Sequence, residues 1–548
     1  MIKELSITKK IFLGLFLSVV FVYCFNAFKE PDSFYHLKAG QVVLETASIP
    51  NSDPFSFVAN GAEWVAHEWL SEAILFISYK VAGFWGVISF VALLGALTSF
   101  IIYLICRIRG VNFYISLLGI LILNALTFEL WIGRPQIFSY LFTALFVYLL
   151  ERFRIDGRKI NLILIALITL IWANMHAGFI LGLAIVFAYL FGGILNHHFK
   201  LQSALDKLKL RNLSFLFISL PFIALLNPSS YKIFTYSYVI LPAIEKLGVM
   251  EWYSILDYLY LNETVIYLAQ MVIFGLLGIY WYLSKRENRD FILVSLILGI
   301  SVLPFISIRH IGFWPVALIP FVLEAVHRFV FVRIENRINS KDFGILLGIV
   351  LLLFSTPKFF SFPKEYYNRL SVPIGGAEFI KRENLKGPIF NLYNDGGFLI
   401  WNLYPSEKIF IDGRSEVYSQ DKLDEYLSIL GGGENWRELV YDKYKLQYFF
   451  ISYRRNPEKL LPLIRDLEND RWRLVYWDDL SVIYVKDDVQ NKEIIKKFAL
   501  NYVGPFRNAL NLPEDDKKQA FAELQGLLGR IENSEIIQQY ARQLMQGR

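Results

Sequence analysis

Hydrophobic positions in the first 358 residues gather in long runs separated by short polar segments. Most runs approach the roughly 20 residues that cross a bilayer as a helix. We therefore predict about eleven transmembrane helices, near residues 11–28, 73–105, 111–130, 137–151, 160–174, 178–195, 212–226, 264–283, 291–307, 311–326 and 343–357. The second run is too long for one crossing, so its first part is expected to lie along the membrane surface.

The basic residues of the short loops orient these helices. One alternate set of loops holds roughly 20 lysines and arginines and the other roughly six, and the basic set is expected to face the cytoplasm. The N-terminus is therefore predicted to be cytoplasmic. We expect residues 11–28 to form an uncleaved anchor, because no small-residue cleavage site follows them. An odd number of crossings places everything after about residue 359 outside the cytosol.

Composition agrees with a membrane protein. Of the 548 residues, 55% are hydrophobic and only 19% are charged. The net charge of +6 resides in short loops between predicted helices, so it indicates orientation and not binding to nucleic acid. The two cysteines are too few for a disulfide framework or for a cysteine-based metal site.

After residue 358 the apolar runs shorten to strand length and alternate with helical patterns. We predict three parts: residues 1–358 as a transmembrane domain with a long outer loop at 29–71, residues 359–488 as an extracytoplasmic α/β domain, and residues 489–548 as a helical tail. The expected strands lie at residues 388–393, 408–412, 447–452, 473–477 and 481–485.

Polar residues that could take part in catalysis or binding fall at or just beyond the ends of the apolar runs. The predicted topology brings them to one membrane face. Ionisable groups near hydrocarbon are costly, so this grouping predicts a single site that opens away from the cytosol. Its members are Asp32, His36, Asp53, His67, Glu68, Arg134, Gln136, Asn174, His176, Glu251, Arg309 and His310.

Two roles suit these side chains. A carboxylate, Asp32 first and Asp53 second, is expected to act as a general base on an acceptor hydroxyl. Arginine and histidine are expected to neutralise a phosphate leaving group. Structural alternatives stay open: Asp53 before Pro54 suits a turn, Asp32 suits the cap of a helix from Ser33, and His67-Glu68 suits the start of a helix. The sequence shows no dedicated set of metal ligands, although it leaves a divalent cation open.

Two motifs in the C-terminal part pair an acid with glycine after an expected strand. They are Asn394-Asp395-Gly396-Gly397 and Asp412-Gly413-Arg414. Such positions often bind ligands in α/β folds. The alternative is local: the glycines satisfy turn geometry, and Asp412 pairs with Arg414.

Several of these segments resemble the GT-C superfamily of multi-span membrane glycosyltransferases, in particular bacterial mannosyltransferase-like and lipopolysaccharide galacturonosyltransferase-like proteins. Pro31-Asp32-Ser33-Phe34-Tyr35 matches the position of that superfamily's acid just after the first span. Similar corners are Arg134-Pro135-Gln136, Asn174-Met175-His176 and Arg309-His310. Ser33 stands where relatives often have a second acid. The Trp-Trp-Asp-Tyr-Gly signature of oligosaccharyltransferases is absent, which argues against protein N-glycosylation.

The resemblance implies transfer of a sugar from a polyprenyl-phosphate donor to a glycan, lipid or protein acceptor outside the cytosol. It also implies a bacterial inner-membrane location. Two other functions remain open at this point: a transporter or flippase for a lipid-linked intermediate, and a noncatalytic envelope assembly protein. A transporter is expected to carry polar groups near the bilayer midplane, whereas these lie at one face.

Overall fold

The computed structural model describes residues 5–127, 130–260, 289–328, 348–349, 363, 365–368, 371–454, 457–507, 512–531 and 534–546. The chain forms two compact units. Unit 1 comprises Met1–Ala27, Val65–Tyr236 and Gly248–Tyr366, and unit 2 comprises Phe28–Trp64, Ser237–Leu247 and Tyr367–Arg548. Residues between the first two apolar helices therefore belong to the same unit as the C-terminal part of the chain.

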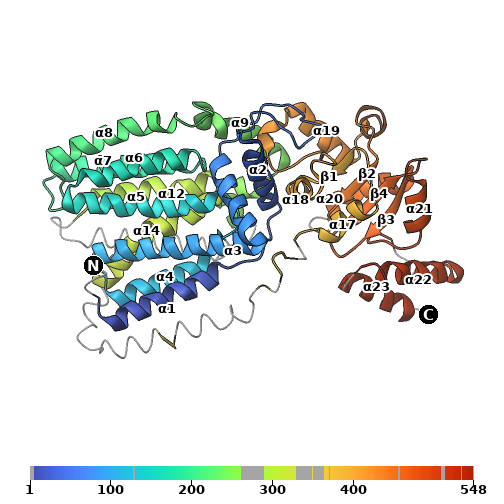
Figure 1. The fold of residues 1–548 in the computed structure, drawn as a ribbon, viewed down its shortest axis with the longest axis horizontal. Coiled ribbons are helices and arrows are strands. Elements are labelled where there is room, and N and C mark those ends of the chain that lie inside the picture. Colours follow the sequence, from blue (N-terminus) through green and yellow to red (C-terminus); the bar gives the residue numbers. More distant parts are fainter. Residues whose placement is uncertain are drawn as a thin grey trace. The chain divides into compact units, whose positions relative to one another are not determined.

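Unit 1 is built from apolar helices, many of which lie side by side (Figure 1). They are α1 (Ile7–Cys24), α3 (Trp69–Ile108), α4 (Phe113–Thr127), α5 (Gln136–Asp156), α6 (Lys159–Ala173), α7 (Phe179–His198), α8 (Lys207–Ala224), η2 (Met250–Trp252), α10 (Ile255–Tyr260), α12 (Phe291–Ser301), α13 (Leu303–Ile306), η4 (Ile308–Gly312) and α14 (Phe313–Val326). Helix α9 (Lys232–Leu247) is shared by the two units.

Four segments in the described part of the chain are long and apolar enough to cross a membrane: Ile7–Cys24, Trp69–Ile108, Phe179–His198 and Ile308–Val326. Shorter apolar helices accompany them at Phe113–Asn124, Lys159–Ala173 and Phe291–Ile306. The chain is thus a helical membrane protein. Of the predicted crossings, 264–283 and almost all of 343–357 lie outside the described residues.

The unusually long α3 is interrupted near its first third. Ala82 and Gly83 leave helical geometry, and Gly83 has φ 60° and ψ −150°, a backbone conformation that is open essentially to glycine alone. The long apolar run predicted at 73–105 therefore consists of two helical pieces. Only the second piece, after Gly83, has the length of a full crossing.

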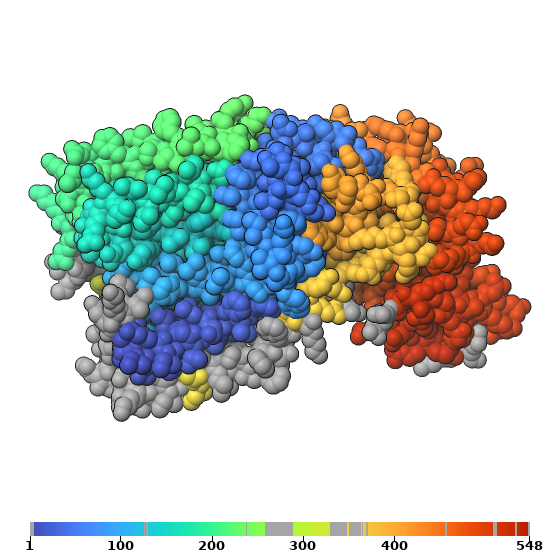
Figure 2. Space-filling view, in the orientation of Figure 1, coloured from blue at the N-terminus to red at the C-terminus, as the bar shows by residue number. Residues whose placement is uncertain are grey.

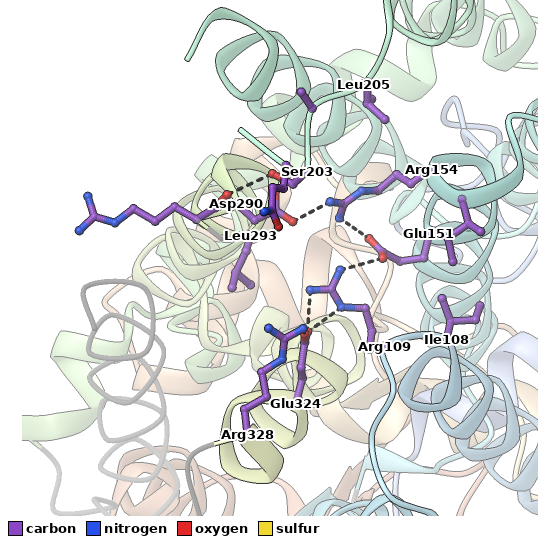
Figure 3. Close-up of a pocket in the computed structure, with 14 residues that line it drawn as sticks. Ile108, Arg109, Glu151, Arg154, Ser203, Leu205, Asp290, Leu293, Glu324 and Arg328 are labelled. Atoms are coloured by element: carbon purple, nitrogen blue, oxygen red, sulfur yellow. Dashed lines mark hydrogen bonds and ion pairs between the residues drawn. The ribbon is translucent and has the colours of Figure 1, made fainter. Parts of the chain in front are cut away.

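Near the C-terminal ends of α3, α5 and α14, charged side chains surround a cavity of about 410 Å³ (Figure 3). Arg109 contacts Glu151 at 3.1 Å and Glu324 at 2.6 Å, and Arg154 contacts Glu151 at 2.9 Å and Asp290 at 2.7 Å. Arg109 follows the last residue of α3 and Arg154 lies in the last turn of α5, where positive charge is favourable. This chain of ion pairs fastens α3, α5 and α14 to the start of α12.

Unit 2 contains a four-stranded sheet with order β1-β2-β4-β3. Its strands are β1 (Ile389–Asn391), β2 (Tyr448–Ile451), β3 (Trp472–Trp477) and β4 (Val482–Lys486). β1 and β2 run parallel, and the remaining pairs are antiparallel. The other elements are α2 (Asp32–Thr46), α17 (Ile374–Arg382), η6 (Tyr393–Asp395), α18 (Gly396–Leu403), η7 (Ser415–Val417), α19 (Gln420–Gly431), η8 (Glu438–Lys443), α20 (Pro457–Asn469), α21 (Lys492–Phe498), α22 (Glu514–Leu528) and α23 (Glu535–Gln546).

Four of the five expected strands are present, and the strand predicted at 408–412 is wrong. Backbone groups of that segment are satisfied by other partners. The Asn391 side chain accepts from Phe410 N at 2.9 Å and donates to Ile411 O at 2.7 Å, and the Ser56 hydroxyl donates to Phe410 O at 2.9 Å. The segment therefore makes an isolated bridge to Ser56 and joins no ladder of the sheet.

Residues 28–64 pack within unit 2 as a helix followed by an irregular segment. Helix α2 lies along α18, with Phe34 and Phe398 ring centroids 5.1 Å apart and the Lys38 ammonium 5.0 Å from the Trp401 ring. In Figure 2 the blue atoms of this segment adjoin the orange atoms near residue 400. The predicted loop at 29–71 therefore contains a helix that is fixed on the C-terminal part.

Candidate functional site

In unit 1, a polar cluster forms where several helices begin. Glu68 precedes the first residue of α3, Arg134 lies just before α5, His176 just before α7, and Arg309 just before α14. A helix N-terminus carries roughly half a positive charge, so four helices contribute positive potential to the cluster. Such helix ends are common anion sites.

Glu251 links the two arginines of this cluster. Its carboxylate lies 3.5 Å from Nη1 of Arg134 and 3.9 Å from Nη1 of Arg309. Burial alone would raise the pKa of Glu251, but Arg134 and Arg309 outweigh burial and hold that pKa below its ordinary value. Glu251 is therefore ionised at neutral pH. The Arg309 guanidinium also stacks 4.4 Å from the Trp252 ring centre.

Glu68 lies between two histidines. Its Oε1 atom is 3.6 Å from Nε2 of His67 and 3.7 Å from Nε2 of His176. Burial raises the pKa of Glu68 to about 7, although Arg134 and Arg309 oppose the shift. Glu68 is thus poised to gain or lose a proton near neutral pH.

His176 is neutral and has a defined tautomer. Burial lowers its pKa well below the usual range, and Arg309 and the neighbouring histidines lower it further. Nδ1 accepts a hydrogen bond from the backbone N–H of Gly178 at 3.0 Å and contacts the Ser139 hydroxyl at 2.8 Å. The proton of a neutral ring therefore resides on Nε2, the atom that faces Glu68.

Three further predicted residues belong to the same unit. Asn174 accepts hydrogen bonds from Trp69 Nε1 at 3.0 Å and from Leu70 N at 3.2 Å, which joins the α6–α7 corner to the start of α3. His310 contacts the backbone oxygen of Ser307 through Nδ1 at 3.2 Å. Gln136 is the first residue of α5.

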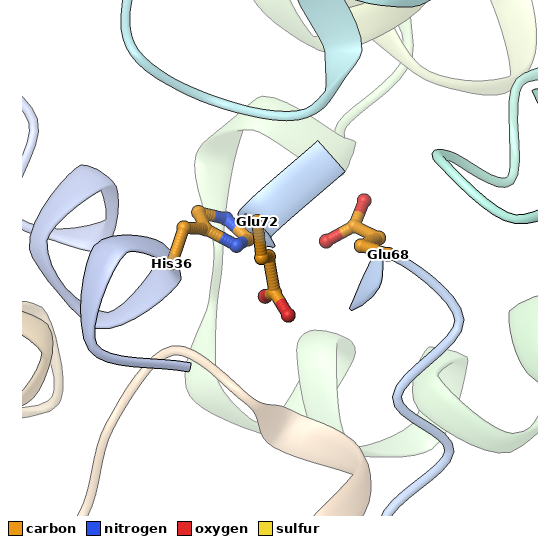
Figure 4. A group of neighbouring side chains, drawn as sticks. All are labelled: His36, Glu68 and Glu72. Carbon is orange, nitrogen blue, oxygen red and sulfur yellow. The ribbon is translucent and has the colours of Figure 1, made fainter. Parts of the chain in front are cut away.

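Sequence reasoning missed Glu72, Ser139 and Trp172. Trp172 donates from Nε1 to the Ser139 hydroxyl at 2.6 Å, so both support His176. Glu72, one turn after Glu68, is 2% exposed, and their carboxylate oxygens lie within 4.8 Å (Figure 4). An acid inside an apolar run was the available signal for Glu72. For Ser139 and Trp172, no such signal existed, because their contacts depend on helix rotation.

In unit 2, Asp32 is the first residue of α2, with Pro31 at the cap position. Its carboxyl group packs on Gly413: a Cβ atom placed there would lie 2.6 Å from Asp32 Oδ1. His36 lies one turn further along α2 and is 2% exposed, with its ring centroid 4.0 Å from that of Tyr35.

Both carboxylate oxygens of Asp53 make structural contacts. Its two carboxylate oxygens accept from Phe55 N and Ser56 N, both at 3.0 Å, and Oδ1 also lies 2.7 Å from Arg414. Arg414 in turn makes a two-pronged contact with Asp412, at 2.8 and 2.7 Å. The turn expected at Asp53-Pro54 and the local Asp412–Arg414 pair are thus both present. Asp395 is bound by the Ser452 hydroxyl at 2.8 Å, which ties the end of β1 to the end of β2.

Comparison by sequence identifies no relative: no protein-family model and no curated protein matches the chain. Comparison by structure finds similar proteins. The archaeal oligosaccharyltransferase AglB from Archaeoglobus fulgidus, in complex with an inhibitory peptide and a dolichol-phosphate, is similar with a TM-score of 0.58 and 10% identity over 88% of this chain and 75% of that chain. ArnT from Cupriavidus metallidurans is similar with a TM-score of 0.52 and 14% identity over 86% of this chain and 97% of that chain.

A third similar structure is the same archaeal oligosaccharyltransferase in complex with Zn and sulfate, with a TM-score of 0.56 and 11% identity over 86% of this chain and 73% of that chain. AglB and ArnT are both GT-C membrane glycosyltransferases. The fold that the sequence resemblance predicts is thereby confirmed: at 10 to 14% identity, the chain shares the fold of these membrane glycosyltransferases.

Proposed function

We propose that the chain is a membrane glycosyltransferase that moves a sugar from a polyprenyl-phosphate donor to a glycan, lipid or protein acceptor outside the cytosol. The observation that carries the proposal is the polar cluster of unit 1. Two arginines, a neutral histidine and the N-termini of four helices converge at the ends of apolar helices. A lipid-linked phosphate needs both parts, a positive site for the phosphate and apolar surroundings for the chain.

The arginines suit a phosphate in particular. The planar guanidinium presents N–H donors in a fork that matches the oxygens of a phosphate. The contacts of both arginines with Glu251 are long, at 3.5 and 3.9 Å. Nε2–H of the neutral His176 is a further donor. Stabilisation of the charge that develops on a leaving group is usually the largest contribution to such catalysis.

Asp32 is proposed as the general base. In the step, the acceptor hydroxyl gives its proton to the Asp32 carboxylate, and its oxygen forms a bond to the anomeric carbon of the sugar. The bond between that carbon and the phosphate oxygen breaks, and its electrons leave with the polyprenyl phosphate, whose charge Arg134 and Arg309 balance. Asp53 is the weaker candidate, because its oxygens already hold two backbone N–H groups and Arg414.

The remaining assignments follow the sequence. We propose a bacterial inner-membrane protein with a cytoplasmic N-terminus, about eleven crossings and an extracytoplasmic C-terminal domain. A divalent cation, if required, would take oxygen ligands from Glu68 and Glu72, since carboxylates suit hard cations. His36, His67, Gln136, Asn174 and His310 are proposed to contact substrate.

Mass spectrometry of lipid-linked sugars and envelope glycans tests this function in cells. Cells without the protein, and cells with Arg309→Gln, should lose one glycan product and accumulate one polyprenyl-linked sugar, because the phosphate loses a counter-charge. Arg158→Gln is the matched control, since that side chain is 72% exposed at the other end of the helices. If Arg309→Gln is present in the membrane at the wild-type level and gives a wild-type glycan profile, the cluster does not bind the donor phosphate as proposed.

A further inference from the structure

The two Asp-Gly motifs of the C-terminal part pack against the start of α2, the position of Asp32. Gly397 is close to the backbone there: an added Cβ would lie 2.6 Å from Pro31 O and 3.2 Å from the Asp32 Cα. Gly413 lies under the carboxyl group, and its added Cβ would lie 2.6 Å from Asp32 Oδ1 and 3.2 Å from Oδ2. Two glycines from different turns thus leave the space that Asp32 fills.

The two turns also hold each other. Gly396, the neighbour of Gly397, packs on the backbone of Ile411 and Asp412, where an added Cβ would lie 2.6 Å from the Asp412 Cα. A side chain at Gly396 would therefore push away the turn that carries Gly413. The glycines serve close approach here, and none of the three has a positive φ.

Arg414 anchors the turn that contains Gly413. Its side chain is 1% exposed and pairs with Asp412 and Asp53. The Phe55 and Trp64 rings lie 4.8 and 4.7 Å from its guanidinium carbon. A buried charge with two carboxylates and two aromatic rings has little freedom to move.

A second anchor holds Gly413 directly. The Tyr393 hydroxyl donates to Gly413 O at 3.1 Å and lies 2.7 Å from the Ser415 hydroxyl. Gly413 is therefore fixed at its carbonyl and through the Asp412 and Arg414 residues on each side. The surface that faces the Asp32 carboxylate is rigid.

We infer that Gly397, Gly413 and Arg414 are positioning residues that set the location of the Asp32 carboxylate, and that this is the purpose of the Asp395-Gly396-Gly397 and Asp412-Gly413-Arg414 motifs. The inference rests on the proposed function, in which Asp32 is the general base. A displacement of a reacting group by about 1 Å can cost about 100-fold in rate. The glycines are thus expected to support the transfer rate through the position of Asp32, without contacting substrate themselves.

The test measures sugar transfer by purified full-length protein, with lipid extract from cells that lack the protein as the donor source. Gly413→Ala should lower the maximal rate by about tenfold or more, while the lipid concentration at half-maximal rate stays unchanged, because the phosphate site is intact. Gly431→Ala is the matched control: it lies in the same unit with nothing within 4 Å of its added Cβ. Its rate should stay within about twofold of wild type.

Gel filtration and thermal unfolding establish that each variant is folded. If Gly413→Ala does not fold, Tyr393→Phe decides, since it removes only the hydroxyl that holds Gly413 O; a reduced maximal rate is expected, and a wild-type rate would overturn the inference. The outcomes separate the two proposals. An inactive Asp32→Asn with a fully active Gly413→Ala overturns the positioning role and keeps the base. A fully active Asp32→Asn overturns the base itself.

Discussion

Glu68 is the residue whose charge state is most open to experiment. Burial raises its pKa to about 7. Below that pH the carboxyl is neutral, and above it a negative charge appears beside His67 and His176, in the field of Arg134 and Arg309. An anion bound by the cluster then meets repulsion. Because the folded-state pKa exceeds the ordinary value of 4.5, this group's contribution to stability is lost as pH rises from about 4.5 to about 7.

Sulfate binding to the purified protein should therefore weaken as pH rises from about 6 to about 8. Sulfate is a suitable probe because its own charge is constant over that range. Glu68→Gln is neutral throughout and should lose most of this pH dependence, whereas the exposed Glu245→Gln should keep it. Isothermal titration calorimetry measures both. An unchanged pH dependence in Glu68→Gln would show that another group titrates at the site.

Several residues that the sequence singled out lie together in unit 1, whereas Asp32, His36 and Asp53 belong to unit 2. The contacts within the cluster were not predicted. Arg134, His176 and Arg309 were found because each lies in a tight corner between apolar runs, where charge is costly and few positions are available. The ion pair of Asp53 could not be predicted from local sequence, because its partner Arg414 lies more than 350 residues later in the chain.

Among the elements, α3 contains the clearest departure from regular geometry. Gly83 has φ 60° and ψ −150° about a third of the way along α3, which has 40 residues. The sequence predicted a run that was too long for one crossing, but it did not locate the break. Gly83 has nothing within 4 Å of an added Cβ, so its requirement is conformational and not steric.

Gly83→Ala should destabilise the protein by about 1–3 kcal/mol, because alanine reaches that backbone conformation only with strain. Thermal unfolding in detergent gives the measurement. Gly14→Ala is the control: it lies inside α1, also with nothing within 4 Å, and alanine favours a helix. Equal unfolding temperatures for Gly83→Ala and wild type would mean that the break is not required.

The sequence predicted the bounds of elements that depend on the local hydrophobic pattern. It missed the elements that depend on side chains far away in the chain. Within the described residues, the apolar runs form helices close to their expected bounds, and four of the expected strands are present. Residues 408–412 have the pattern of a strand, yet Asn391 and Ser56 bind their backbone groups instead. Helix α2 lies in a segment predicted mainly as loop, because its stability comes from α18 and not from its own pattern.

Taken as a whole, the chain combines a GT-C fold with two charged clusters at the ends of helices of unit 1. The cluster around Glu68 and the ion-pair chain around Arg109 occupy opposite ends of α3, α5 and α14. In the first, the charged groups lie further apart, at 3.5 to 3.9 Å. The second pairs its charges closely, at 2.6 to 3.1 Å, and fastens the helices together.

We expect the purified protein to transfer a sugar without any other protein, with Asp32 as the general base. The most direct measurement is transfer by the purified protein in detergent, with lipid extract and envelope acceptor from cells that lack it. Wild type should release polyprenyl phosphate and form a glycosylated acceptor. Asp32→Asn should fold normally and form none, and Asp53→Asn should be less stable but retain activity in its folded fraction. Absence of product from wild type, as for a transporter, or full activity of Asp32→Asn would contradict the account.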